Sequence, residues 1–133
     1  MTIKYNLELS PEQARLVSEA CDFYSRVLIG QFDRITEACL DIGGSVPDYC
    51  QKRDMANDLL RITRRIFWPE LVHPGQSYGI GHNQKADRLY DVHQVLRNKI
   101  AWEEQPTGSL GVAHDSPMQF SDLPLPACSI SKE

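Results

Sequence analysis

The sequence predicts an α+β fold of about four helices with a small antiparallel sheet, which the N-terminal strand and the C-terminal tail would form. Three observations lead to this class. Apolar and polar residues alternate at the N-terminus, four later stretches carry helical periodicity, and the last part contains short apolar runs between prolines. The 133 residues suit one hydrophobic core of ordinary size, so we expect a single domain over residues 1–133.

The N-terminal segment has the pattern of a strand followed by a well-marked helix start. In Ile3–Leu9 every second residue is apolar, as in a half-buried strand. Ser10, Pro11 and Gln13 form a start of the capping-box type, because the serine and glutamine side chains can each satisfy a backbone N–H of the other. The helix runs to about Ile29. Its apolar face is too wide for one contact, which suggests contact on two sides, one of them with a partner subunit.

Glycines separate the second helix from its neighbours. Gly30 interrupts the first helix, Gln31–Ile42 continues helically, and Gly43-Gly44 closes it. The third helix, Tyr49–Phe67, carries a clear apolar stripe. It also contains four arginines and two aspartates: Arg53, Arg61, Arg64, Arg65, Asp54 and Asp58. This group is either a solvated face of ion pairs or a basic rim around an anion pocket.

A loop rich in glycine and proline leads into the last helix. Trp68-Pro69 ends the third helix, and the segment up to His82 is irregular. The final helix spans about Asn83–Glu104 and is stopped by a proline and a glycine. The tail would add three short strands to the sheet, at Leu110–Ala113, Met118–Ser121 and Ala127–Ser131.

Composition places the chain among globular proteins and argues against several classes. Hydrophobic residues make up 41% and charged residues 24%, and no apolar run approaches membrane-spanning length. The N-terminus lacks the apolar core of a signal peptide, so we expect a cytoplasmic protein with no membrane partner. The net charge of −4 argues against binding to duplex nucleic acid, which needs a surplus of Lys and Arg.

The cysteines and histidines lack the spacings of a disulfide framework or a metal site. No C-x-x-C occurs, and the cysteines lie mostly on apolar helix positions, so we expect reduced, buried thiols at Cys21, Cys39, Cys50 and Cys128. No two histidines share a helical face as in H-x-x-x-H. We therefore expect neither a metal nor a cofactor.

Two cations lie on the apolar side of the last helix. On a helical wheel, His93 and Arg97 fall within the apolar arc, one turn apart. A guanidinium there needs a partner that replaces its lost hydration, and its planar donors suit a phosphate or a carboxylate. The partner is either an anionic ligand or an internal carboxylate, for which Asp33, Asp87 and Asp91 are candidates.

The preceding loop and two more arginines could complete such a site. In Ser77–Asn83 the glycines allow close backbone approach, and Tyr78 offers a ring that can stack on a base. Asn83 is either a ligand contact or the N-cap of the final helix. Arg88 adds donors near the start of that helix, and Arg26 adds them beside the break after the first helix, where the alternative is a simple joint. No motif for a nucleophile or an acid–base couple stands out, so we assign no catalytic residue.

Several motifs together resemble a family of small phage proteins. The segments LELSPEQ, FYSRVLIGQF, SYGI and YDVHQVLRNKIAW are similar to the Thoeris anti-defence sponge family over most of the chain. The resemblance implies a non-catalytic protein that binds the cyclic ADP-ribose signal of bacterial TIR-domain proteins. It also implies binding of cyclic oligonucleotides in some members and dimers that assemble further. We therefore expect a homodimer or a higher homo-oligomer, which agrees with the wide apolar face of the first helix.

The resemblance further implies a ligand set. In the family an aromatic residue, an asparagine and two arginines one helical turn apart hold the signal, which matches Tyr78, Asn83, His93 and Arg97. His93 departs from this pattern, and a neutral imidazole holds a diphosphate less firmly than a guanidinium does. We expect a sponge that sequesters a cyclic nucleotide messenger in the bacterial host cytoplasm without cleaving it. The alternatives are a non-enzymatic protein-interaction module or inhibitor of a host factor, and a phosphodiesterase-like enzyme.

Overall fold

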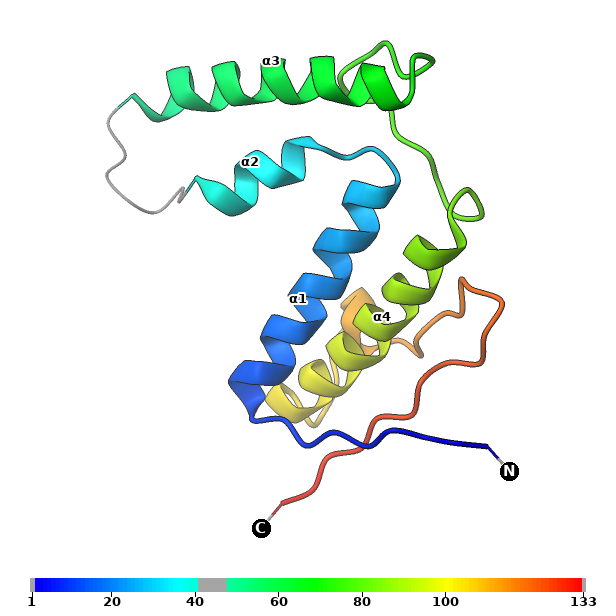
Figure 1. Cartoon of the computed structure of the whole chain (residues 1–133). Helices are drawn as coiled ribbons and strands as arrows, with labels where there is room; N and C mark the ends of the chain where they lie inside the picture. The colour runs from blue at the N-terminus through cyan, green and yellow to red at the C-terminus, as the bar shows by residue number, and fades with distance from the viewer. Residues whose placement is uncertain (1, 41–47, 133) are drawn as a thin grey trace. The chain divides into compact units, whose positions relative to one another are not determined.

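In the computed structural model the described residues, 2–40 and 48–132, are helical wherever they are regular. These two ranges contain four α-helices and one short 3₁₀ helix, in order: α1 Pro11–Leu28, α2 Asp33–Cys39, α3 Tyr49–Phe67, α4 Gln84–Glu104 and η1 Val112–His114 (Figure 1). No strand occurs among these residues, so the predicted α+β class with an antiparallel sheet is wrong. No helix in the described ranges combines the length and the apolar character needed to cross a membrane.

The N-terminal segment predicted as a strand, 3–9, lies outside any sheet. Ile3, Tyr5 and Leu7 are 77, 95 and 75% exposed, so the alternating pattern covers no core. A strand is stabilised when one face packs against apolar surface and a neighbouring strand completes its backbone ladder. Neither condition is met within the described part of this chain.

The three predicted tail strands are also absent. The first, over 110–113, overlaps η1, and the stretches 118–121 and 127–131 have no ladder. Prolines close to these stretches withhold backbone donors, and the N-terminal segment supplies no partner. The tail is held by side chains of α4 instead, as described below.

The chain divides into two compact units. We call Met1–Asp22 together with Arg88–Glu133 the terminal unit, and Phe23–Asp87 the central unit. Helices α1 and α4 each contribute residues to both units. The single domain over 1–133 remains a prediction.

The predicted start and end of α1 are confirmed to within a residue. The Ser10 N–H donates to Gln13 Oε1 at 2.9 Å, and the Gln13 N–H donates to Ser10 Oγ at 3.2 Å, which is the reciprocal capping box. The helix ends at Leu28, and Gly30 follows with φ +95°. This backbone angle favours glycine, and a Cβ at position 30 would also lie 2.9 Å from Leu71 Cδ1, so the leucine side chain would have to shift.

Helix α1 buries serines more fully than its apolar residues. Ser18 and Ser25 are 6 and 5% exposed, whereas Leu16 and Tyr24 are 57 and 40% exposed. The predicted homo-oligomer stays a prediction.

Of the other helices, α3 and α4 have their predicted bounds to within a residue, whereas α2 does not. Helix α2 is shorter than the predicted 31–42, and its predicted closure by Gly43-Gly44 lies outside the described residues. Helix α3 spans the predicted residues, Tyr49–Phe67. Helix α4 begins at Gln84 and ends at Glu104, as predicted within one residue.

The central unit is organised around an aromatic cluster. Helix α2 lies alongside α3 (Figure 1), and Phe32, just before α2, is only 7% exposed. Its ring centroid lies 6.1 Å from that of Phe67 and 5.7 Å from that of Trp68, both in edge-to-face geometry. Trp68 in turn meets Tyr78 at 5.9 Å. These contacts attach the loop before α4 to the end of α3.

The terminal unit is built around buried polar groups on α4. The Asp91 carboxylate, 2% exposed, accepts the N–H groups of Phe120 and Ser121 at 2.7 and 3.2 Å. Asn98 Nδ2 donates to the carbonyl oxygens of Ala113 and Asp115 at 3.1 and 2.5 Å. Backbone groups that a sheet would have satisfied are therefore satisfied by α4 side chains.

Candidate functional site

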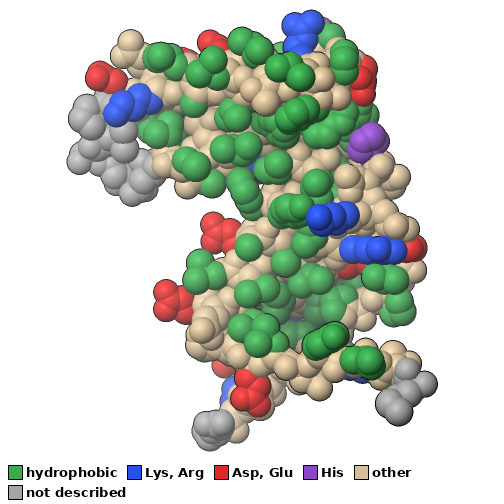
Figure 2. Space-filling view, in the orientation of Figure 1, with side chains coloured by type: hydrophobic (Ala, Val, Ile, Leu, Met, Phe, Trp, Pro, Cys, Tyr) green, Lys and Arg blue, Asp and Glu red, His purple; other side chains and the backbone are tan. Residues whose placement is uncertain are grey.

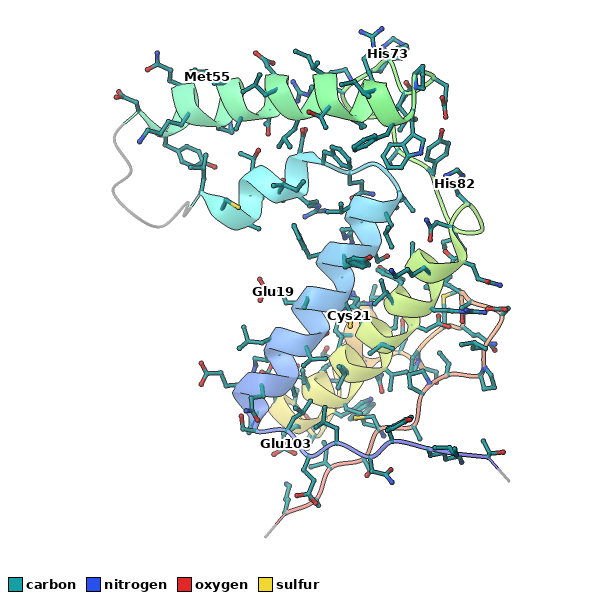
Figure 3. The ribbon with its side chains drawn as sticks, in the orientation of Figure 1. Glu19, Cys21, Met55, His73, His82 and Glu103 are labelled. Atoms are coloured by element: carbon teal, nitrogen blue, oxygen red, sulfur yellow. The ribbon has the colours of Figure 1, made fainter. Side chains whose placement is uncertain are left out.

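The loop before α4 uses its aromatic ring internally. Tyr78 stacks on His82, with ring centroids 3.5 Å apart and planes 5° apart, and meets Trp68 edge-on. The Tyr78 N–H donates to the carbonyl oxygen of Ile29 at 2.8 Å. His82, labelled in Figure 3, is thus a stacking partner that sequence spacing alone does not reveal. One face of the Tyr78 ring is already covered.

Asn83 serves as the N-cap of α4. Its Oδ1 accepts the Ala86 N–H at 2.9 Å, and its carbonyl oxygen accepts the Asp87 N–H at 3.1 Å. The Asp87 carboxylate accepts the Gly81 N–H at 3.0 Å, which ties the loop to the helix start. A ligand that used Asn83 Oδ1 would have to displace the cap.

Arg26 lies in a chain of polar contacts at the end of α1. Its Nη1 donates to Gln31 Oε1 at 3.2 Å, and Gln31 Nε2 lies 3.5 Å from Ser77 Oγ. These contacts agree with the alternative interpretation of this region, a simple joint between two helices rather than a ligand site.

Arg88 binds a carboxylate of the tail bidentately. Its Nε and Nη2 donate to the two Asp122 oxygens, each at 3.0 Å. The hydrogen bonds from Arg88 lower the pKa of Asp122, and the same bonds raise the pKa of Arg88. A phosphate could use these donors only by displacing Asp122.

His93 faces α1 within the terminal unit. Its Nδ1 lies 2.9 Å from Ser18 Oγ and 3.0 Å from the Ser18 carbonyl oxygen, and its Nε2 lies 3.9 Å from Asp22 Oδ1. The side chain is 12% exposed. His93 therefore joins α4 to α1, which makes it a positioning residue in this structure.

Arg97 differs from the other candidate arginines. Its Nη2 donates to Gln94 Oε1, one turn earlier on α4. Its Nε is buried and has no hydrogen-bond partner, and no carboxylate of the described residues lies within ion-pair distance of the guanidinium. A half-buried cation with spare donors is the arrangement that an incoming anion could complete.

A hollow of about 70 Å³ adjoins Arg97. Its lining comes from α4 and from the start of the tail: Gln94, Arg97, Asn98, Val112, Ala113, Asp115, Ser116, Pro117 and Met118. Ligand sites for whole small molecules usually measure roughly 300 to 1,000 Å³. This hollow can therefore take only part of a nucleotide, such as one phosphate.

The carboxylates considered as internal partners of Arg97 are engaged elsewhere. Asp33 binds Arg61 at 3.1 Å, Asp87 accepts a loop N–H, and Asp91 holds the tail. Each of these contacts lies within one unit of the chain. Among the described residues, the internal ion pair that we considered for Arg97 is not formed by any of the three.

The predicted ligand residues fall into two sets. Three of them, Tyr78, Asn83 and Arg26, belong to the central unit, whereas Arg88, His93 and Arg97 belong to the terminal unit. Within the terminal unit the two cations one turn apart have different neighbours, because His93 meets Ser18 and Arg97 meets Gln94 and the 112–118 segment.

The most extensively bonded arginine, Arg64, is not among the predicted site residues. It is 4% exposed, and its guanidinium donates to five backbone carbonyl oxygens, those of Gly30, Leu71, His73, Pro74 and Gln76. The distances range from 2.7 to 3.4 Å. A helical wheel could have revealed it, because position 64 lies one turn from both Leu60 and Trp68 on the inner side of α3.

The other arginines of α3 divide as follows. Arg53 pairs with Asp54 at 3.1 Å, so the interpretation as a surface ion pair is confirmed for Arg53. Arg61 lies 3.7 Å from Asp58, but its closer partner is Asp33 of α2, at 3.1 Å. That interpretation is wrong for Arg64, which is buried in the loop that follows α3. Arg65 is exposed, and the alternative of a basic rim around an anion pocket stays a prediction.

A second hollow, of about 210 Å³, lies in the central unit. Its lining combines Gln31, Phe32, Asp33, Arg34, Glu37, Arg64, Pro74, Gly75, Gln76 and Ser77. Arg34 pairs with Glu37 at 3.1 Å, and the Arg64 donors are directed to carbonyl oxygens. Arg64 has no carboxylate partner, but four of the five carbonyl oxygens that it binds lie within residues 71–76, so an anion here would have to displace the loop from Arg64. This makes the hollow a poorer anion site than the one at Arg97.

The four cysteines are free, but the prediction that all of them are buried is wrong for two. Cys39 and Cys50 are exposed, because they lie on helix faces that no other segment of the described chain covers. Cys21 and Cys128 are half-buried, and burial raises the pKa of the Cys21 thiol. No cluster of three or more His, Cys, Asp or Glu side chains suitable for a metal ion occurs in ranges 2–40 and 48–132.

Comparison with family models, with curated proteins and with solved structures gave no match.

Proposed function

We propose that the protein binds and sequesters a cyclic nucleotide messenger, a cyclic ADP-ribose isomer or a cyclic oligonucleotide, without cleaving it. The resemblance to the phage anti-defence sponges suggests the ligand class. The single structural observation that supports the proposal is Arg97, a half-buried guanidinium with no carboxylate partner among the described residues and a small hollow beside it.

The proposed phosphate contact is the Arg97 guanidinium. Arg88 and His93 are already engaged, with Asp122 and Ser18, so they support α4 and the tail and are secondary candidates for the ligand. Tyr78, Asn83 and Arg26 remain predictions from the sequence. Since the hollow accommodates one phosphate, the base and ribose would contact protein surface beyond it.

Calorimetric titration with cyclic ADP-ribose isomers and cyclic oligonucleotides tests the proposal, followed by chromatography of the ligand released on heating. We expect binding, with the ligand recovered intact. Arg97→Ala should weaken binding at least about a hundredfold, because a buried charge-assisted contact is lost. The control is Arg15→Ala in the same unit, whose pair with Glu104 is half exposed and which should leave affinity unchanged.

Each other outcome has a defined meaning. Recovery of cleaved ligand would make the protein an enzyme. Binding that Arg97→Ala leaves intact would remove this hollow from consideration. No heat with any nucleotide would favour the protein-interaction module or host-factor inhibitor instead.

A carboxylate at the same hollow provides a second test. Asp115 contributes to the lining, and its negative charge would repel a phosphate bound there. Asp115→Asn should therefore increase affinity for the nucleotide several-fold, whereas a purely structural role for Asp115 would leave affinity unchanged or lower it.

A further inference from the structure

Helix α3 presents an apolar stripe to solvent. Met55, Leu59, Ile62 and Ile66 are 61, 65, 62 and 72% exposed, although α3 is a regular 19-residue helix. Figure 2 shows hydrophobic side chains along this helix, and Met55 is labelled in Figure 3. The inner side of the helix carries the buried Arg64 instead. The stripe is therefore not the face that α3 uses in its own unit.

The spacing of the stripe is that of a helix–helix seam. Its members are four, three and four residues apart, the alternation found at the core positions of coiled coils. Among the described residues only four apolar side chains are buried: Phe32, Leu71, Ala86 and Val95. A chain with so few buried apolar residues gains substantially from covering a continuous exposed stripe.

We propose that this stripe binds the same stripe of a second copy of the chain, with the two α3 helices antiparallel about a two-fold axis. In that register Leu59 lies opposite the partner's Ile62, and Met55 lies opposite the partner's Ile66. Each contact occurs twice, as a self-complementary two-fold interface requires.

Charge complementarity selects the antiparallel orientation. Asp58 and Arg65 flank the seam on one side, and both are exposed. Antiparallel pairing places Asp58 beside the partner's Arg65 and Arg65 beside the partner's Asp58, which gives two equivalent ion pairs. Parallel pairing would place Asp58 beside the partner's Thr63, with no opposite charge. The only ion pair of Asp58 among the described residues is a longer contact, 3.7 Å to Arg61 on its own helix.

The other side of the seam permits close approach. Antiparallel pairing brings Ala56 beside the partner's Thr63, and both side chains are small. The four stripe side chains offer roughly 300 Å² of apolar surface per copy, if a fully buried Leu or Ile removes about 100 Å². This is below the size of a standard stable interface, so we expect a reversible dimer of modest affinity. The inference does not depend on nucleotide binding.

Sedimentation velocity over a range of protein concentrations tests the dimer, with Leu59→Glu as the disrupting variant. We expect a monomer–dimer equilibrium whose dissociation constant rises at least about tenfold in the variant, because a charge then lies in the apolar seam. Val72→Glu is the matched control, since Val72 is 51% exposed in the same unit but lies off α3. Circular dichroism should show that both variants stay helical.

A charge-reversal pair tests the orientation. Asp58→Arg alone and Arg65→Asp alone each place like charges at both ion-pair positions, so each variant should dimerise more weakly than the native chain. When the two variants are mixed, opposite charges meet at both positions, and a heterodimer should form. A chain that is monomeric at every concentration, a dimer insensitive to Leu59→Glu, or a mixture without heterodimer would each overturn the proposal.

Discussion

The loop that follows α3 depends on one buried arginine, so Arg64→Met should destabilise the central unit strongly. Methionine keeps most of the length and volume of the side chain but removes its five donors. The carbonyl oxygens of residues 71–76 and of Gly30 would then lose their common partner. Since buried carbonyl groups need partners, the loop should detach from the end of α3.

The expected magnitude follows from the distances. Two bonds are short, from Arg64 Nη2 to the His73 oxygen at 2.7 Å and from Nη1 to the Gln76 oxygen at 2.8 Å. The other three bonds are 3.3 to 3.4 Å long, so they contribute little to the free energy of unfolding. Hydrogen bonds from a charged donor contribute about 1.5 to 3 kcal/mol each, so the short pair contributes about 3 to 6 kcal/mol. The substitution also removes the buried Arg64 Nε that has no partner. Removing this unpaired group recovers part of the lost stability, so we expect the free energy of unfolding to fall by about 3 kcal/mol.

Urea denaturation followed by tryptophan fluorescence measures this loss. The chain has two tryptophans, and Trp102→Phe leaves Trp68, which lies in the aromatic cluster beside the loop. The control is Arg34→Met in the same unit, because its pair with Glu37 is half exposed and should contribute less than about 0.5 kcal/mol. A loss below about 1 kcal/mol for Arg64→Met, or equal losses for both variants, would refute the reasoning.

Three further predictions concern the tail and the thiols. Asp91→Asn should speed amide hydrogen exchange at residues 120–121 at least about tenfold, because those N–H groups lose a charged acceptor; unchanged exchange would mean that the tail is held by other contacts. In an NMR pH titration, Asp122 should titrate below the ordinary range of an aspartate, and Arg88→Ala should return its pKa to that range. Because the pKa is lowered by folding, the stabilisation is present at neutral pH and is lost as the pH falls through the folded pKa. Burial raises the pKa of the Cys21 thiol, so a thiol reagent should modify it more slowly than the exposed cysteines, and equal rates would contradict this.

Local sequence signals predicted the helices well. Reciprocal capping by Ser10 and Gln13, the break at Gly30 and the cap at Asn83 depend on contacts within a few residues, and all three are present. Such signals are readable because the partners are close in the chain. The strand pattern of 3–9 is also local, but a strand requires a partner that is distant in sequence, and the described chain supplies none.

The candidate site was predictable only in part. A helical wheel singles out Arg97 as a cation that needs an anion, and the structure leaves it without a carboxylate among the described residues. The wheel could not separate Arg97 from His93, since the two share a face and differ only in what lies against them. Likewise, the sequence shows the apolar stripe of α3 but not whether another segment covers it, and the side that faces its own unit is the one with Arg64.

The sequence by itself therefore determined where α1, α3 and α4 begin and end to within a residue, because caps, glycines and periodicity act within one or two turns. Only the tertiary structure decided which helix faces are covered and which polar groups meet. Asp91 holds the tail, Arg64 holds the loop, and the apolar stripe of α3 remains exposed. These outcomes depend on contacts between segments far apart in the chain, and such contacts leave no periodic signal in the sequence.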